Sequence, residues 1–352
     1  MNSTVSLAGR KIGAGEPVFI VAEGGVNHNG DLNIALQLVE AAADAGADAI
    51  KFQTWHTELV ISRSAPLADY QRRTTSETQS QYDMVARLEL EPDAFRCLQR
   101  RAASRGLVFF STPFDLPSVD LLVDLNVPLF KIPSGEINHF PLLEKVARTG
   151  RPAIVSTGMC SLGEVEAAVN CLQGAGAREL VLLHCLSSYP APMEEINLRA
   201  MQTLAYAFHM PVGLSDHTLG DGAAIAAVSL GAAVIEKHLT ISRDLAGPDH
   251  QASLDPSGFR DFVSTIRLLE LALGDGVKRL QPSERNVRSV ARRSIVAARD
   301  LAAGTRLADD DLCMKRPGTG LESQHLHEVI GRITCRDLPT DSMLSWSDLL
   351  PA

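Results

Sequence analysis

Short apolar runs alternate with helix-like stretches through most of the 352-residue chain, and this repetition limits the possible folds most strongly. The runs are rich in Val, Ile, Leu and Phe, as expected for strands buried on both faces, and each is followed by a segment with helical spacing. They cover residues 18–22, 49–53, 107–110, 129–132, 153–155, 180–183, 212–214 and 233–236. Eight such units in about 240 residues predict an α/β fold of the (β/α)8 TIM-barrel type.

The chain after residue 274 has a different pattern. Residues 275–288 are polar and contain Pro282, which indicates a linker, and residues 289–352 carry turn signals rather than long helices. We therefore predict a barrel over residues 1–274, a linker over 275–288 and a small β-rich domain over 289–352. A domain of roughly 60 residues is only marginally stable alone, so we expect it to dock on a barrel, its own or a partner's.

Charge and composition exclude several classes of function. The net charge is -9 and no block of Lys or Arg stands out, which argues against nucleic-acid binding and against a membrane-surface helix. No run approaches the roughly 20 apolar residues of a membrane span, and the amino terminus lacks the apolar core of a signal peptide. The six cysteines form no CxxC pair and fit reduced thiols. We expect a cytoplasmic protein whose partners are small molecules.

A long polar insertion separates the second and third strands. It runs from Thr54 to Asp83 and contains the stretch TTSETQSQYD. Long loops of this kind either fold over a site as a lid or lie on the surface without a role in it. The sequence leaves both interpretations open.

Two histidines follow neighbouring strands near the carboxyl end of the predicted barrel. His217 comes after Asp216, and His238 lies two residues beyond Glu236. Residues just past the carboxyl ends of parallel strands meet on one face, so the two imidazoles and the two carboxylates suit a divalent metal with open positions. The alternative is that both are capping or core histidines.

Two lysines point to an anionic ligand on the same face. Lys51 and Lys131 lie inside otherwise apolar strands, where unpaired ammonium groups are costly to bury. With nearby hydroxyls they suggest a phosphate-ester pocket; these hydroxyls belong to Thr112, Ser134, Ser156 and Ser215. Glu23 and Glu136 add candidates for acid/base chemistry or hydroxyl binding. The alternatives are snorkelling or salt-bridged lysines. From these residues we predict a metal-assisted enzyme acting on a phosphorylated substrate.

Several motifs together resemble the sialic acid synthase family. They are AEGGVNHNGDL (22–32), ADAIKFQT (47–54), FFSTPFD (109–115), FKIPSGE (130–136), GLSDHT (213–218), EKHLT (236–240) and GPDHQASLDP (247–256). The segments RRSIVAARDL (292–301) and KRPGTGL (315–321) resemble the antifreeze-like SAF domain, a β-clip fold, that this family carries. The resemblance covers nearly the whole chain.

The resemblance implies that phosphoenolpyruvate condenses with N-acetylmannosamine and water to give N-acetylneuraminate and phosphate. It implies a divalent metal, Mn²⁺ first with Mg²⁺ or Co²⁺ as alternatives, held by His217 and His238, and Glu23 as the acid/base near C2. The implied contacts to phosphoenolpyruvate come from Lys51, Gln53, Thr112, Lys131, Ser134, Ser156, Ser187 and Ser215. The implied contacts to the sugar come from Glu136, Tyr189, Asp249 and Arg316. A domain-swapped homodimer is also implied, in which Arg316 reaches the partner's barrel.

Two features bear on which sugar is used. The chain departs from the family pattern at Gly24-Gly25 and at Ser187, where an Asn is common, and this affects the detail of substrate binding. His250 resembles the sialic and legionaminic branches more than the pseudaminic branch. The alternatives are therefore 2,4-diacetamido-2,4,6-trideoxymannose, which gives legionaminic acid, then pseudaminic acid synthesis, and last a non-catalytic carbohydrate-binding protein.

Overall fold

The first of two units in the chain is a closed barrel of parallel strands. The computed structural model describes residues 4–66 and 80–351 and divides the chain into units Met1–Gly274 and Asp275–Ala352. The eight barrel strands are β3 (Phe19–Gly25), β4 (Ala49–Thr54), β5 (Val108–Pro113), β6 (Phe130–Ile132), β7 (Ala153–Ser156), β8 (Leu180–Cys185), β9 (Val212–Asp216) and β10 (Val234–His238). They pair in chain order and β10 closes on β3. The predicted TIM barrel is confirmed.

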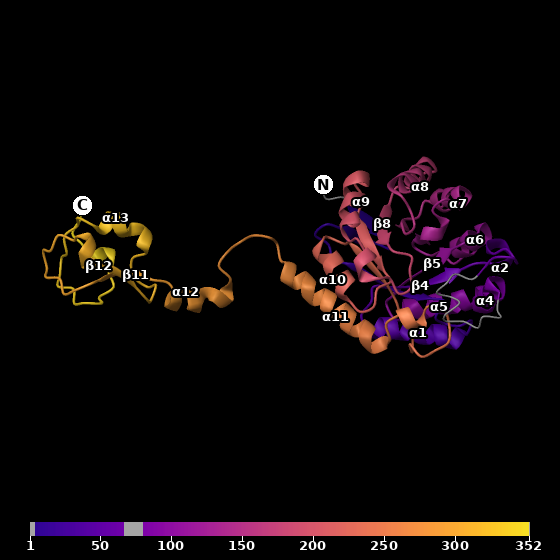
Figure 1. The fold of residues 1–352 in the computed structure, drawn as a ribbon, viewed down its shortest axis with the longest axis horizontal. Helices are drawn as coiled ribbons and strands as arrows, with labels where there is room; N and C mark the ends of the chain where they lie inside the picture. Colours follow the sequence, from indigo (N-terminus) through magenta and orange to yellow (C-terminus); the bar gives the residue numbers. More distant parts are fainter. Residues whose placement is uncertain (1–3, 67–79, 352) are drawn as a thin grey trace. The chain divides into compact units, whose positions relative to one another are not determined.

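Eight helices, each in the connection after one barrel strand, pack outside the barrel (Figure 1). These helices are α1 (Leu32–Asp44), α5 (Pro92–Ser104), α6 (Leu116–Asp124), α7 (Phe140–Arg148), α8 (Leu162–Gly174), α9 (Arg199–Phe208), α10 (Gly222–Ser229) and α11 (Pro256–Leu273). Capping residues set where some of these helices begin. At α1 the Asp31 side chain accepts a hydrogen bond from Asn33 N at 2.7 Å, and at α8 Ser161 and Glu164 form a capping box. Apolar side chains fill the layer between strands and helices.

Strand register brings the polar strand ends together. In the parallel ladder Glu23 lies opposite both Lys51 and His238, and Ser215 lies opposite Glu236. All seven residues of β3 and all five of both β9 and β10 are buried. Side chains alternate between the two sides of a strand, so every second residue points into the barrel.

An amino-terminal hairpin was not predicted from the sequence. Strands β1 (Thr4–Leu7) and β2 (Arg10–Gly13) pair antiparallel around Ala8 and Gly9, both at positive φ. Leu7 and Ile12 are fully buried and join the apolar cluster inside the barrel. The strands have four residues each, and β2 carries Arg10 and Lys11, so their apolar pattern is too short to identify.

The insertion after β4 contains regular structure that the sequence did not predict. Helix α2 (Thr57–Val60) lies within it, and α4 (Gln81–Leu88) begins in its last three residues. Most of the stretch TTSETQSQYD lies in residues 67–79, outside the described residues. The lid therefore stays a prediction.

The second unit contains a small antiparallel sheet with its own core, as predicted. Strands β11 (Ser294–Ala297) and β12 (Leu312–Lys315) pair, and single bridges tie further segments to one another. The unit also has helices α12 (Arg285–Ala291) and α13 (Leu326–Val329). Its core consists mainly of Ile295, Ala297, Leu301, Leu307, Leu321, Val329, Leu338, Leu344 and Leu349. Since α12 spans residue 288, the segment predicted as a linker includes part of a helix. None of the helices in the described residues has the length and apolar character to cross a membrane.

Candidate active site

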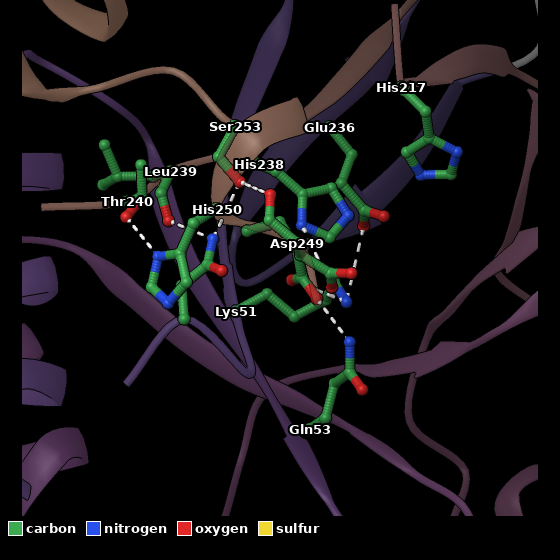
Figure 2. A network of polar contacts seen from close by, with 12 residues as sticks. Lys51, Gln53, His217, Glu236, His238, Leu239, Thr240, Asp249, His250 and Ser253 are labelled. Atoms are coloured by element: carbon green, nitrogen blue, oxygen red, sulfur yellow. Dashed lines mark hydrogen bonds and ion pairs between the residues drawn. The ribbon is translucent and has the colours of Figure 1, made fainter. Parts of the chain in front are cut away.

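A cavity of about 490 Å³ lies at the carboxyl ends of the barrel strands. This volume suits a small-molecule substrate. Most of the predicted site residues line it: Glu23, Lys51, Gln53, Thr112, Lys131, Ser134, Ser156, Ser187, Tyr189, Ser215, His217, His238 and Asp249. Figure 2 shows part of this group, contributed by several strands and by the segment after β10. The strand-end argument and the family motifs together therefore predicted which side chains share this cavity, and Asp249 came from the motifs alone.

The two lysines of the cavity are paired with buried carboxylates. Lys51 Nζ lies 2.7 Å from Glu23 Oε2 and 3.9 Å from Glu236 Oε2, and Lys131 Nζ lies 3.5 Å from Glu236 Oε1. All four side chains are at least nine-tenths buried. The expectation of unpaired ammonium groups was wrong, because Glu236 lies between them. The sequence predicts Glu236 on this face beside the two histidines, and the structure pairs it with the two lysines.

Ionisation of this four-residue cluster is finely balanced. Burial, opposed by Lys51, raises the pKa of the Glu23 carboxyl to about 7. Burial also acts to raise the pKa of Glu236, but Lys131 and Lys51 outweigh it and the pKa is lowered. Burial lowers the pKa of Lys131. With both lysines protonated, the cluster is neutral when both carboxylates are ionised and carries one positive charge when Glu23 is protonated.

Three hydroxyls of the cavity accept hydrogen bonds through their oxygens. Thr112 Oγ1 accepts from Lys51 Nζ at 3.0 Å, Ser156 Oγ accepts from Lys131 Nζ at 2.7 Å, and Ser134 Oγ accepts from Gly158 N at 2.8 Å. A hydroxyl that accepts in this way can still donate its hydrogen to a phosphate oxygen. Ser215 differs, because its hydroxyl donates to Glu236 Oε1 at 3.0 Å.

The two histidines face one another across the cavity. Their ring centroids are 5.3 Å apart, and the Tyr189 ring lies 4.1 Å from His217 and 5.7 Å from His238. His217 Nδ1 donates to the Leu186 carbonyl oxygen at 2.8 Å, so Nε2 is the nitrogen that a neutral His217 ring presents as a metal ligand. Burial acts to lower the pKa of His217, but Cys185, the Leu186 carbonyl and Glu236 outweigh it and raise the pKa above its usual value. Burial lowers the pKa of His238 well below its usual value, so its imidazole is neutral.

These imidazoles fit a divalent metal as two ligands. His238 Nδ1 is buried without a hydrogen-bond partner among the described residues, and a ligating imidazole commonly donates its other N–H to a carbonyl, as His217 does. Within residues 4–66 and 80–351 no three His, Cys, Asp or Glu side chains are grouped as a metal site. Among the described residues, His217 and His238 are therefore the two candidate metal ligands. The nearest carboxylate to His238 given by the ion pairs is Asp249, whose Oδ2 lies 3.9 Å from His238 Nδ1.

The carboxylate of Asp216, expected beside the histidines, is turned away from the cavity. Its Oδ2 accepts from Lys237 Nζ at 2.8 Å, and Lys237 also donates to the Thr218 carbonyl oxygen at 2.6 Å. Both charged side chains are almost fully buried and neither lines the cavity. The pair lies next in sequence to both histidines and ties β9 to β10.

Two predicted sugar-binding residues do not line this cavity. Glu136 lies in a 3-10 turn, Ser134–Glu136, and its Oε2 is 2.8 Å from His139 Nδ1. Arg316 is exposed and belongs to the second unit. The sugar-binding roles of Glu136 and Arg316 stay predictions.

An apolar wall of the cavity was not predicted. Val26, Trp55, Met84 and Leu88 form a buried cluster of their own, and all four line the cavity. Met84 and Leu88 come from α4, which follows residues read from the sequence as a polar insertion. The signal available was the apolar spacing of Met84, Val85 and Leu88, which fits one face of a helix.

Comparison with known families agrees with this arrangement. The model of the NeuB family matches residues 38–278, and the model of the SAF domain matches residues 292–350. The chain belongs to the NeuB family. The NeuB match spans most of the barrel unit, and the SAF match lies within the second unit, which confirms the resemblance to sialic acid synthases stated from the motifs.

Three NeuB-family relatives are similar over most of their length. An N,N'-diacetyllegionaminic acid synthase of Campylobacter jejuni is 46% identical over 93% of this chain and 98% of its own. A protein of the same name from Legionella pneumophila is 43% identical over 96% of both chains. The crystal structure of N-acetylneuraminic acid (sialic acid) synthetase from Leptospira borgpetersenii, in complex with citrate, is 36% identical with a TM-score of 0.72, covering 82% of this chain and 95% of that chain.

Proposed function

We propose that this chain is a nonulosonic acid synthase that condenses phosphoenolpyruvate with an N-acetylated mannosamine-type sugar. C3 of phosphoenolpyruvate forms a bond to the aldehyde carbon, water adds to C2, and the C2–O bond breaks to release phosphate. The observation that supports this most is the cavity cluster of Lys51 and Lys131, with hydroxyls beside each ammonium group. Such a cluster suits a phosphate that is bound and then released.

Each group of the cluster has a role in this proposal. The Lys51 and Lys131 ammonium groups, with the Thr112 and Ser156 hydroxyls, hold the phosphate and carboxylate oxygens. The Glu23 carboxyl, with its pKa raised to about 7 by burial, is suited to take a proton from the water that adds to C2. Glu236 lies between the two lysines and keeps both ammonium groups in place.

His217 and His238 would hold the divalent metal, Mn²⁺ in our proposal. When bound, the metal supplies Lewis-acid polarisation of the sugar aldehyde. Asp249, which lines the same end of the cavity, would bind sugar hydroxyls. Burial raises the pKa of Asp249 to about 6, so it is mostly ionised at neutral pH and accepts hydrogen bonds there.

Two observations favour the diacetamido-trideoxy sugar over N-acetylmannosamine. The relatives at 46% and 43% identity carry the name N,N'-diacetyllegionaminic acid synthase. The apolar wall of Val26, Trp55, Met84 and Leu88 suits a sugar that presents methyl groups in place of hydroxyls. We therefore propose 2,4-diacetamido-2,4,6-trideoxymannose as the better substrate, with N-acetylmannosamine as the second candidate.

Phosphate release from phosphoenolpyruvate in the presence of Mn²⁺ tests this proposal. We expect release that depends on added sugar, a higher kcat/KM with the diacetamido-trideoxy sugar than with N-acetylmannosamine, and loss of turnover when EDTA removes the metal. A higher kcat/KM with N-acetylmannosamine would instead support synthesis of N-acetylneuraminate. Sugar-independent release, or none with either sugar, would contradict the synthase proposal and direct tests to carbohydrate binding by the SAF domain.

The domain-swapped homodimer is tested through Arg316. We expect Arg316→Ala to raise the sugar KM about 10-fold to 100-fold, because one charged contact to the sugar is lost, while the KM for phosphoenolpyruvate changes little. Mixing Arg316→Ala with a variant whose barrel is inactive should restore part of the activity, since one barrel then receives an intact Arg316 from its partner. An effect confined to the KM for phosphoenolpyruvate would contradict the role of Arg316, and mixing without recovery would contradict the swap.

A further inference from the structure

The loop after β3 carries three polar residues to which the proposed chemistry gives no role. Asn27 and His28 are fully buried, and Asn29 follows them in the motif NHNG. None of the three lines the cavity. Buried polar side chains are costly unless they make hydrogen bonds, so their contacts should explain why they are there.

The Asn27 side-chain amide contacts both ends of the segment between β10 and α11. Its Nδ2 donates to the Leu239 carbonyl oxygen at 2.9 Å and to Ser253 Oγ at 2.8 Å. A carbonyl oxygen only accepts, so the NH2 group must face Leu239, and both its hydrogens are used. Asn27 Oδ1 is buried without a partner among the described residues. The two N–H donors therefore account for an amide at this position.

Ser253 passes this contact on to Asp249. Its hydroxyl donates to the Asp249 carbonyl oxygen at 2.6 Å, and Figure 2 shows Ser253 beside Asp249 and Leu239. At the other end, Leu239 directly follows His238. One buried amide thus ties the backbone beside His238 to the backbone of Asp249, whose Oδ2 lies 3.9 Å from His238 Nδ1.

The segment that holds Asp249 has little regular structure to fix it. Between β10 and α11 the described chain forms one 3-10 turn, His250–Ala252, and one isolated bridge, Leu239 to Leu254, in which Leu254 N donates to the His238 carbonyl oxygen at 3.0 Å. A second tie comes from the same β3 loop, because Asn29 Nδ2 donates to the Ala246 carbonyl oxygen at 2.9 Å and Asn29 Oδ1 lies 3.1 Å from His250 Nε2. Side-chain contacts from the β3 loop therefore add to this single backbone bridge in placing Asp249.

We propose that Asn27 is a positioning residue that, through Ser253, fixes Asp249 relative to His238 and so sets the sugar end of the cavity. This rests on the proposed function, in which Asp249 binds sugar hydroxyls. Asn27 itself contacts no substrate, since it does not line the cavity. Its loss should therefore affect sugar use selectively, whereas a purely structural role would lower stability without separating the two substrates.

The test compares Asn27→Ala and Ser253→Ala with the wild-type enzyme in the sugar-dependent phosphate-release assay. We expect both variants to lower kcat/KM for the sugar about 10-fold to 100-fold, because a displaced binding group disturbs substrate geometry. The KM for phosphoenolpyruvate should stay within about twofold. Ser253→Thr, which keeps the hydroxyl, should retain most of the wild-type kcat/KM. If Asn27→Ala does not fold, Ser253→Ala, which breaks one link of the chain, decides the question.

Two further variants separate positioning from general destabilisation. Asp31→Ala removes a helix cap in the same loop, the 2.7 Å bond from Asn33 N, without touching the Asp249 segment, and should leave both KM values unchanged. In the background of Asp249→Ala, adding Asn27→Ala should have little further effect on sugar use. The positioning proposal would be overturned if the losses in kcat/KM for the sugar were additive in the double variant, or if Asn27→Ala affected both substrates equally. In either case, sugar-dependent turnover by the wild-type enzyme would still support the synthase proposal. An inactive wild-type enzyme would instead count against the proposed function.

Discussion

Replacing Lys131 with methionine is expected to lower kcat/KM for phosphoenolpyruvate by about 10²-fold to 10³-fold. The Lys131 ammonium group is buried, 2.7 Å from Ser156 Oγ and 3.5 Å from Glu236 Oε1. Methionine matches the unbranched apolar stem of lysine as far as Cε but lacks the ammonium group, which leaves the cluster one positive charge short. An anionic substrate would then meet two carboxylates and a single ammonium group, that of Lys51. Steady-state kinetics with each substrate varied in turn measure the loss.

Folding and surface charge are controlled separately for this variant. Removing one partner of a buried ion pair costs about 3–5 kcal/mol, so thermal unfolding must establish a temperature at which Lys131→Met is folded. Lys145→Met is the matched control, because it removes a half-exposed lysine paired with Asp120 on the surface, and it should leave kcat/KM within about twofold. A folded Lys131→Met enzyme with kcat/KM within tenfold of wild type would contradict the proposed phosphate site.

The barrel could be predicted from the sequence because its strands are buried on both faces and read as continuous apolar runs. The hairpin β1–β2 could not, since only Leu7 and Ile12 of its eight residues are fully buried. The apolar wall from α4 was hidden for a similar reason. Met84 and Leu88 lie on one short helix, next to a polar stretch that dominates the local composition.

The site was predicted as a set of residues but not as a set of contacts. Strand ends and family motifs identify which side chains share a face, and thirteen of the fifteen predicted residues line the cavity. Which carboxylate meets which lysine depends on register and on strand tilt around the barrel. The sequence therefore could not show that Glu236 pairs with both lysines, that Asp216 turns outward to Lys237, or that a 3-10 turn carries Glu136 to His139.

Replacing Glu23 with glutamine is expected to lower kcat by about 10²-fold to 10⁴-fold, with smaller changes in either KM. The Glu23 carboxyl is buried, with Oε2 2.7 Å from Lys51 Nζ and Oε1 3.0 Å from Gln53 Nε2. Glutamine has nearly the same shape but exchanges no proton, so it separates proton transfer from the packing of the site. Single-turnover phosphate release measures the chemical step directly.

The result for Glu23→Gln also distinguishes two roles of the carboxylate. If Glu23 served only as the counter-charge of Lys51, its removal would leave the cluster more positive, and binding of phosphoenolpyruvate would tighten while kcat stayed near wild type. A large fall in kcat with retained binding therefore supports proton transfer, whereas tighter binding with unchanged kcat would contradict it. Glu144→Gln, which removes an exposed carboxylate paired with Arg148 on α7, controls for loss of a surface charge and should change kcat by less than about twofold.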